Sequence, residues 1–413
     1  MASTREERLT ARGPKRILAI DACGARGVLA AGLLGALEAQ LRRERGDPNL
    51  RLWDYFDLIG GLSGGALLAG ALAAGASVEE ACGLYIEAGP DPKAAPKGDP
   101  VRRPKFDRAR LEACLDEAFG DAHIGDARIR VGLALLVKPL EAAAPEIWSN
   151  APGAATKDKS FVEAILASVG GESLFDGRPG FADAALCGAP SPVWPLLRFA
   201  TSPRGLGWPA GPGKISIVSL GAGRLRPSLP ARVFEAAPDP NPAALAANVA
   251  TRAGFALESA VFEAGEEALA ALTELCDPAG GGRAFAPCDL QRIDVELSQE
   301  ALTRLGFGAA EIQAATERRP VNAQILQVWR RIGEAASASA VAGRPTPDAP
   351  ANPPASAKRR GKLFQPAESV LVAPEAPQPT QGEAPAQSPP GRRPRSRLEA
   401  LAGVLGGKPE AGG

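Results

Sequence analysis

A single serine set among glycines is the first feature of this chain that could do chemistry. Residues 60–65 spell Gly-Gly-Leu-Ser-Gly-Gly, between the apolar run 55–59 and a segment rich in Ala and Leu. Gly61-Leu-Ser-Gly-Gly65 fits the pattern G-x-S-x-G, which exposes a serine hydroxyl where a strand turns sharply into a helix. The N-terminus of that helix favours developing negative charge. The segment predicts a nucleophilic Ser63; a buried glycine-rich turn without chemistry is the alternative.

A nucleophilic serine needs a base, and the usual base is histidine. The chain has one histidine, His123. A Ser-Asp-His order would squeeze its acid between Ser63 and His123, which is cramped for the usual arrangement, so His123 is predicted to be a loop or strand-entry residue. A carboxylate must then take the proton directly, in a site that keeps it ionised but partly desolvated. The sequence therefore favours a Ser/Asp dyad.

Strands, glycine-rich loops and helices alternate in the first part of the chain. Residues 16–20 and 55–59 are predicted buried strands, and each leads through a glycine-rich loop into a helix, the first at 28–41. This repeat predicts an α/β fold with a parallel sheet. Further strands are expected at 128–137, 146–149, 214–220 and 293–297, and further helices at 78–86, 107–119, 160–168, within 242–275, and at 321–335.

Three motifs, in order, resemble those of the patatin-like phospholipases. That family carries D-G-G-G-x-R-G after its first strand, then G-x-S-x-G, then D-G-[GA]. The corresponding segments here are Asp21-Ala-Cys-Gly-Ala-Arg-Gly27, Gly61-Leu-Ser-Gly-Gly65 and Asp183-Ala-Ala185. The resemblance covers roughly residues 15–225. It implies a three-layer α/β/α fold around a mostly parallel central sheet.

The resemblance also implies a function, lipid acyl hydrolysis by a phospholipase A or another carboxylic ester hydrolase. Ser63 would be the nucleophile and Asp183 the base, with no metal or cofactor. Backbone amides of Ala22, Cys23 and Gly24 would bind the oxyanion. Arg26 would order the first loop or meet the charge of an anionic head group. The supporting residues implied are Asp21, Arg26, Gly27, Gly61 and Gly65.

The first loop departs from the family pattern, because Ala22 and Cys23 replace two glycines, and Ala184 replaces a third after Asp183. If either loop position needs a positive φ, its side chain costs about 1 kcal/mol and could turn an amide away. The alternative function is therefore a catalytically weakened domain that binds lipid or a protein partner. A dinucleotide-binding loop is disfavoured, because G-x-G-x-x-G is lacking.

Composition excludes some partners and compartments. Lys and Arg together equal Asp and Glu at 47 each, so no global basic field favours nucleic acid. The six cysteines are scattered, and neither a disulfide framework nor a zinc site is expected. Residues 58–77 lack charge but contain six glycines, and are predicted to be a strand, turn and helix rather than a membrane span. The charged N-terminus is unlike a signal peptide.

These observations predict a cytoplasmic protein with peripheral contact at the inner membrane face; the oligomeric state is left open. The proposed membrane contacts are a basic loop and the basic tail clusters 358–362 and 392–397; the loop residues are Lys93, Lys97, Arg102, Arg103 and Lys105. The domains expected are a flexible N-terminus (1–14), a catalytic domain (15–225), its helical extension (226–337) and a disordered, basic tail rich in Pro and Ala (338–413).

Overall fold

The computed structural model describes residues 4–89, 108–169, 180–187, 191–228, 241–276, 286–316 and 323–341. All of these belong to one unit, Met1–Pro366. The predicted basic loop from Lys93 to Lys105 and the tail beyond Val341 lie outside the described residues. In the part of the chain that is described, no helix has the length and apolar character needed to cross a membrane.

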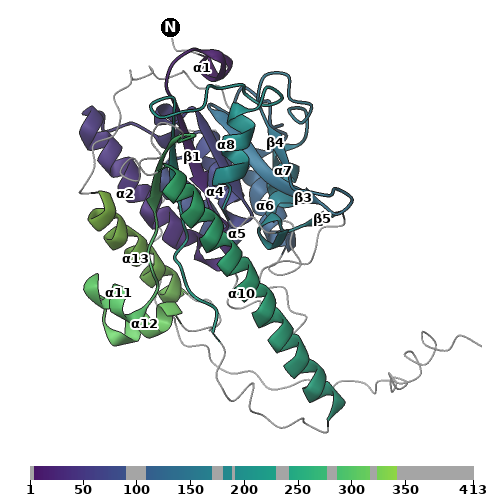
Figure 1. The fold of residues 1–413 in the computed structure, drawn as a ribbon, viewed down its shortest axis with the longest axis vertical. Coiled ribbons are helices and arrows are strands. Elements are labelled where there is room, and N and C mark those ends of the chain that lie inside the picture. Colours follow the sequence, from purple (N-terminus) through teal and green to yellow (C-terminus); the bar gives the residue numbers. More distant parts are fainter. Residues whose placement is uncertain are drawn as a thin grey trace, which may run out of the picture. The chain divides into compact units, whose positions relative to one another are not determined.

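A mostly parallel sheet lies at the centre of the described structure (Figure 1). The strand order is β4-β3-β2-β1-β6-β7, and β5 pairs with β3 off this path. Only β4 and β5 run antiparallel to their neighbour among these strands. The strands are β1 (Lys15–Ile20), β2 (Leu58–Leu62), β3 (Gly132–Pro139), β4 (Glu146–Ser149), β5 (Phe181–Ala182), β6 (Ile215–Leu220) and β7 (Asp289–Ile293).

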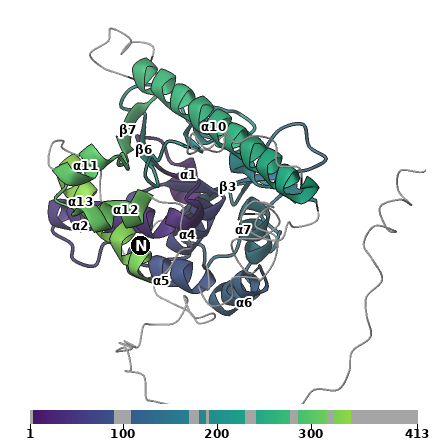
Figure 2. The same ribbon diagram turned by 90° about the horizontal axis from the view of Figure 1, so that it is seen from below.

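Helices cover both faces of this sheet (Figures 1 and 2). They are α1 (Arg5–Thr10), α2 (Gly27–Arg45), α3 (Leu52–Tyr55), α4 (Gly64–Ala73), α5 (Val78–Ala88), α6 (Arg108–Phe119), α7 (Phe161–Val169), α8 (Val193–Thr201), α10 (Pro242–Cys276), α11 (Gln299–Arg304), α12 (Ala309–Thr316) and α13 (Ala323–Val341), with 3-10 turns η1 (Gly24–Arg26) and η2 (Ala184–Cys187). The helix α1 lies within the segment predicted to be flexible.

The sheet separates two apolar cores, because successive strand residues point to opposite faces. In β1, Leu18 and Ile20 join a core with α2, α4, α5, α7 and α13. Their neighbours Ile17 and Ala19 join a second core with α8 and the end of α10. Burial on both sides explains why β1 is apolar almost throughout. The predicted α/β fold with a mostly parallel central sheet is confirmed.

Three strand predictions are displaced along the chain, and one of them is the strand expected at 128–137, which is β3 at Gly132–Pro139. The strand expected at 55–59 is β2 at Leu58–Leu62, because Leu52–Tyr55 instead forms α3, whose Asp54 accepts a hydrogen bond of 3.0 Å from the amide of Arg51. The strand expected at 293–297 is β7 at Asp289–Ile293. The polar residues of β7 interrupt the apolar run that would have marked it as a buried strand. The lone His123 is exposed and forms an isolated bridge with Ser160.

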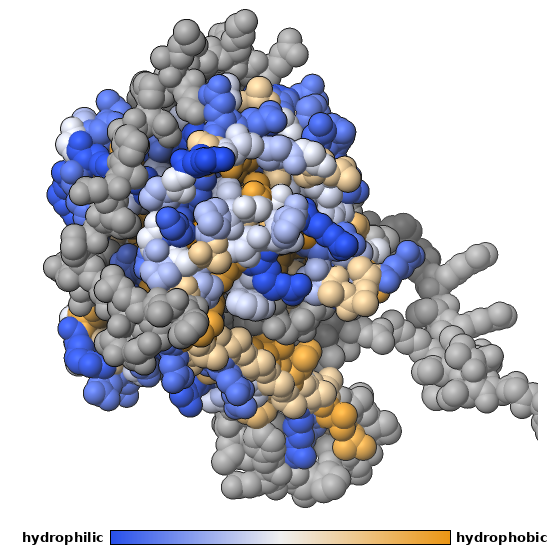
Figure 3. Space-filling view, turned by 45° about the horizontal axis from the view of Figure 1, so that its top comes forward, coloured by the Kyte–Doolittle hydropathy of each residue, from blue (hydrophilic) through white to orange (hydrophobic). Residues whose placement is uncertain are grey.

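The long helix α10 leaves apolar side chains exposed along one side. Leu245, Val249 and Leu257 are exposed, and their spacing places them within one third of the helix circumference. Figure 3 shows apolar residues gathered where α10 extends away from the sheet. At its other end, Leu272 and Cys276 are buried in the second core. The helix is therefore anchored at its C-terminal end.

Close packing of α2 against α13 depends on glycine. The two helices lie side by side in Figures 1 and 2. A Cβ atom on Gly32 would lie 2.5 Å from the carbonyl oxygen of Arg330. One on Gly333 would collide with the carbonyl oxygen of Leu29. Any side chain at either position must push the helices apart.

Gly333→Ala should therefore destabilise the protein, lowering the free energy of unfolding by roughly 1–3 kcal/mol through overpacking. The matched control is Gly254→Ala in α10, where a Cβ atom meets nothing within 4 Å. That change should be neutral or stabilising by up to about 1 kcal/mol, since alanine favours helix more than glycine does. Denaturant unfolding of both variants measures the difference, and equal effects would contradict the packing argument.

Candidate active site

Ser63 lies on a strained turn at the end of β2. Its φ of 53° and ψ of −131° make it the one described residue other than glycine with a positive φ. Such strain costs on the order of 1–3 kcal/mol and persists only where neighbours impose it. They do so here: a Cβ atom on Gly65 would lie 2.6 Å from the carbonyl oxygen of Ile20 and closer still to that of Asp21. One on Gly61 would strike the carbonyl oxygen of Gly65.

The structure brings Ser63 and Asp183 into contact across 120 residues of chain. The Oγ of Ser63 donates a hydrogen bond of 3.1 Å to Oδ2 of Asp183. The other carboxylate oxygen, Oδ1, accepts from the amide of Ala185 at 2.9 Å. Asp183 directly follows β5, whose pairing with Lys138 and Pro139 at the end of β3 carries it toward the end of β2.

The Asp183 carboxyl has an unusually high pKa for an aspartate. Both it and Ser63 are buried, with exposed fractions of 4% and 1%. Burial raises the pKa of Asp183 to about 6, although hydrogen bonds from Ala185 and Ser63 oppose the rise. At neutral pH the carboxyl is still mostly ionised. It is also a stronger base than an exposed aspartate, which suits proton abstraction from a hydroxyl.

Ser168 is a contact of the turn that the sequence analysis missed. Its hydroxyl accepts a hydrogen bond of 3.1 Å from the amide of Ser63 and donates one of 2.6 Å to the carbonyl of Leu136. Ser168 is fully buried on α7. A lone hydroxyl at the end of the apolar run 164–169 was the signal available in the sequence. Through these two hydrogen bonds, the Ser168 hydroxyl fixes the backbone of Ser63 to the neighbouring strand β3.

The first loop places its glycine where the backbone requires one. Cys23 has a φ of −92° and a ψ of −25°, which any residue adopts, whereas Gly24 has a φ of 50°. Ala22 is not among the described residues with positive φ. A Cβ atom on Gly64 would lie 3.3 Å from the amide nitrogen of Gly24, so that amide lies beside the serine turn. Ala22 and Cys23 therefore introduce no strain from left-handed backbone.

Tyr85 on α5 also supports this loop and was missed from sequence. Its hydroxyl donates a hydrogen bond to the carbonyl of Gly24. Its ring leaves no room for a Cβ atom on Gly27. Arg26 donates through Nε to the carbonyl of Ala222 at 3.0 Å, and so holds the loop against the segment after β6. The Asp21 side chain pairs with Arg292 at 2.7 Å.

Two cysteines of the described residues lie close together in the second core, without forming part of a metal-binding cluster. Among the described residues, no group of three or more His, Cys, Asp or Glu side chains could hold a metal ion. The Sγ atoms of Cys276 and Cys288 lie 3.6 Å apart in the second core, and both are free thiols. These two cysteines therefore pack together where the end of α10 lies beside the start of β7.

The part of the chain that carries these residues is similar to known proteins. Residues 18–187 match the model of the patatin-like phospholipase family. The matched span contains Ser63 and Asp183, and the resemblance predicted from the three motifs is confirmed. The matched span covers the first loop, the serine turn and the 3-10 turn after Asp183.

Several curated patatins are similar to this part of the chain. Patatin-17 of Solanum cardiophyllum is 34% identical over 122 residues, covering 28% of this chain and 31% of that protein. Patatin-T5 of Solanum tuberosum is 32% identical over 124 residues, 28% of this chain and 32% of that one. A protein named probable inactive patatin-3-Kuras 1, also of Solanum tuberosum, is 31% identical over 124 residues, 28% and 33% of the two chains. The chain thus matches about a third of the length of these relatives.

Among solved structures, VipD from Legionella pneumophila is similar at 13% identity, covering 81% of this chain and 67% of that one, with a TM-score of 0.38. The type III effector protein ExoU matches at 14% identity over 42% of each chain, with a TM-score of 0.23.

The raised pKa of Asp183 predicts a stability effect with a definite sign. Because its native pKa is about 6, above the unfolded value, the native state binds the proton more tightly and loses stability as pH rises between about 4 and 6. Above that window the ionised carboxylate costs up to roughly 3 kcal/mol. Asp183→Asn should therefore be more stable than the wild type at pH 8, by roughly 1–3 kcal/mol.

The gain should shrink as pH falls toward 4, because the wild-type carboxyl is then neutral in the native state too. Urea unfolding at several pH values measures it. Asp116→Asn, at an exposed position of α6, is the control and should change little at any pH. A pH-independent difference between Asp183→Asn and wild type would contradict the assignment.

Proposed function

We propose that the protein is a lipid acyl hydrolase that cleaves phospholipid or other lipid esters with a Ser63/Asp183 dyad. The observation that carries the proposal is the hydrogen bond of 3.1 Å from Ser63 Oγ to Asp183 Oδ2, on a strained turn within the patatin-like span. A hydroxyl held in direct contact with a buried carboxylate of raised pKa is suited to nucleophilic catalysis without histidine.

In the first half of the reaction, Ser63 Oγ attacks the ester carbonyl carbon while its proton moves to Oδ2 of Asp183. The tetrahedral intermediate then collapses, and Asp183 returns that proton to the departing alcohol. In the second half, water attacks the acyl-enzyme and gives its proton to Asp183. Ser63 recovers a proton as the fatty acid leaves, so the dyad ends as it began. No step in this route uses a metal or a cofactor.

Backbone amides supply the oxyanion stabilisation that we propose. The amide of Gly24 lies beside the serine turn, and we assign those of Ala22 and Cys23 to the same loop surface. The amide of Gly64, at the first residue of α4, is a further donor of the kind such turns use. Fixed donors at a helix N-terminus stabilise developing negative charge, and one such donor is worth roughly 100-fold in rate or more.

The alternative is a weakened patatin-like domain that binds lipid or a protein partner without turnover. Its motivation was the loss of glycine at Ala22 and Cys23, and this argument weakens because Cys23 has ordinary backbone angles and Ala22 no positive φ. One relative bears a name that calls it probably inactive, so similarity alone does not separate the two functions. A cytoplasmic location with peripheral contact at the inner membrane face remains a proposal drawn from sequence.

Ser63→Ala tests the proposal directly. The purified protein should hydrolyse a short-chain fluorogenic ester and at least one phospholipid presented in vesicles, and should be labelled covalently by a fluorophosphonate probe. Ser63→Ala should abolish labelling and lower kcat/KM by at least about 10⁴-fold, as expected for loss of a nucleophile. Ser160→Ala, at the exposed serine that precedes α7 and accepts a hydrogen bond from the amide of Glu163, is the control: losing this cap costs about 1 kcal/mol of stability, and labelling and kcat/KM should stay at the wild-type level.

Turnover that persists in Ser63→Ala would refute the mechanism. A folded wild-type protein that binds the vesicles but neither turns over nor takes up the probe would favour the binding module instead.

The pH dependence of turnover should follow the Asp183 carboxyl. With a pKa raised to about 6, the base is protonated below that pH and cannot accept the serine proton. The value of kcat/KM should therefore fall on the acidic side of pH 6, by about tenfold per pH unit. Rates of hydrolysis of an uncharged ester, measured between about pH 4.5 and pH 8, define this acidic limb of the pH profile.

A second buried carboxyl, Asp21, also has a pKa raised to about 6 by burial, so its variant serves as the control. Asp21→Asn should keep the acidic limb, at lower overall rates, if Asp183 is the titrating base. A rate that stays flat down to pH 5 would contradict the assignment.

A further inference from the structure

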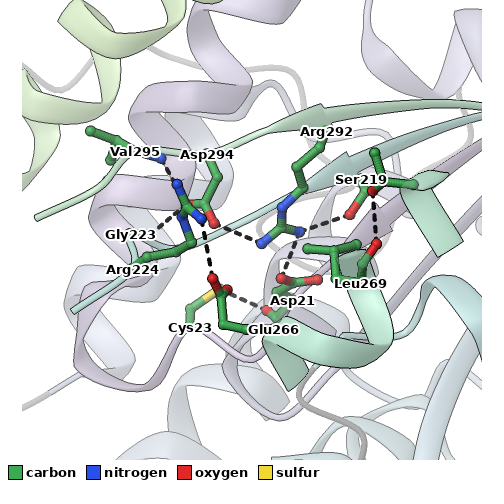
Figure 4. A network of polar contacts seen from close by, with 11 residues as sticks. Asp21, Cys23, Ser219, Gly223, Arg224, Glu266, Leu269, Arg292, Asp294 and Val295 are labelled. Atoms are coloured by element: carbon green, nitrogen blue, oxygen red, sulfur yellow. Dashed lines mark hydrogen bonds and ion pairs between the residues drawn. The ribbon is translucent and has the colours of Figure 1, made fainter. Parts of the chain in front are cut away.

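Arg292 places a charge on β7, the last strand in the sheet order. It lies on β7, where it pairs in register with Ser219 of β6, which in turn pairs with Ala19 of β1. Paired residues of parallel strands, and residues two apart along a strand, share one face of the sheet. Asp21 and Asp294 therefore project on the same face as Arg292. Figure 4 shows these side chains gathered around the guanidinium group.

The guanidinium group binds two carboxylates and a hydroxyl. Its Nη1 lies 2.7 Å from Oδ2 of Asp21 and donates to the hydroxyl of Ser219 at 2.7 Å. Its Nη2 lies 2.7 Å from Oδ2 of Asp294. Burial lowers the pKa of Arg292, but Asp21 and Asp294 raise it above its usual value overall. The group is thus a fixed cation shared by two carboxylates.

Buried ion pairs are an expensive way to stabilise a fold, because desolvation offsets much of their attraction. Apolar residues at these positions would carry no such cost. Stability alone therefore does not explain these ion pairs. A second role is suggested by the segment that they hold in place, the first loop.

The cluster fixes both ends of the first loop. At one end Asp21 is held by Arg292; at the other, Arg26 donates to the carbonyl of Ala222. The loop that Arg26 contacts is itself held, since Oδ1 of Asp294 accepts a hydrogen bond of 3.0 Å from the amide of Gly223. The oxyanion amides proposed above lie between these two anchored ends.

Asp21 is also coupled to the serine turn through its backbone. Its amide donates to the carbonyl of Leu220 at 2.9 Å, and its own carbonyl lies against Gly65 in the first turn of α4. A shift of Asp21 must therefore move the loop amides relative to Ser63. Errors of about 1 Å in such geometry can cost on the order of 100-fold in rate.

We propose that Arg292 is a positioning residue, which acts through its ion pairs with Asp21 and Asp294 to hold the amides of residues 22–24 toward Ser63. The inference rests on the proposed function and deepens it. Arg292 itself touches no reacting atom.

The test compares Arg292→Gln, Asp21→Asn, their double variant and Arg292→Lys, with kcat expressed per active site titrated by the fluorophosphonate probe. Arg292→Gln and Asp21→Asn should each lower kcat on the order of 100-fold, as for a misplaced oxyanion donor, with KM changed less than about twofold. The double variant should be no worse than the worse single variant, because the two residues act as one unit. Arg292→Lys, which keeps the charge but not the fork, should recover part of the loss.

Arg128→Gln is the matched control. This arginine also pairs with two carboxylates, Asp121 and Asp126, but it lies in the segment that leads into the start of β3, three strands away from β6 and four from β7 in the sheet order. It should lower stability at most and leave kcat per titrated site unchanged. A kcat for Arg292→Gln within about threefold of wild type, or losses that multiply in the double variant, would overturn the proposal.

A second measurement does not need turnover, so its outcome is separate from that of the proposed function. Amide hydrogen exchange of peptides that span residues 21–27 should quicken in Arg292→Gln, while peptides from β2 and α4 keep their protection. Unchanged protection of the loop would overturn the proposal, whether or not the wild-type protein proves to be active.

Discussion

The contact between two backbone segments, the end of β1 and the start of α4, is the constraint on which the site depends. Adjacent parallel pairing of Ile20 with Gly61 brings the first loop and the serine turn out of the sheet side by side. Gly65 lets the helix approach the carbonyls of Ile20 and Asp21 more closely than any side chain would allow. With the two backbones in contact, the turn has no room to relax. The strain at Ser63 is therefore imposed by the sheet register.

Burial gives two aspartates similar pKa values and different uses. Asp183 has a pKa of about 6, and its carboxylate accepts hydrogen bonds from a hydroxyl and an amide, as the proposed base would. Burial also raises the pKa of Asp21 to about 6, but its carboxylate is paired with Arg292, which fixes its position. Two carboxylates can thus do separate work because one has a cationic partner and the other has a hydroxyl. Ionising a carboxyl whose pKa is raised in the native state costs stability at neutral pH in both cases.

The sequence predicted what is local and missed what is contributed from far along the chain. The serine turn and the alternation of strands and helices could be inferred from local patterns, whereas Asp183, 120 residues from Ser63, could be assigned only because its segment resembles a family motif. Ser168, Tyr85 and Arg292 leave no motif, since each acts through a partner in another element. The displaced prediction for β7 has the same origin: Gln291 and Arg292 interrupt its apolar pattern. The place of Arg292 in the sheet makes sense only once Asp21 and Ser219 are known to bind its guanidinium group.

In the first loop the backbone requires glycine at position 24 alone among residues 22–24, although the family pattern has glycine at all three. Gly24 has the positive φ, while Cys23 turns with ordinary angles and buries its thiol against the carbonyl of Asp21 at 3.1 Å. A non-glycine residue in a compatible conformation reduces the number of states open to a loop. Replacing the permissive residues by Ala22 and Cys23 should thus narrow the loop's conformations around the one seen here, provided that its ends are held. Arg292 and Arg26 hold them, so the departure from the family pattern and the buried ion pairs belong to a single way of keeping these amides in place.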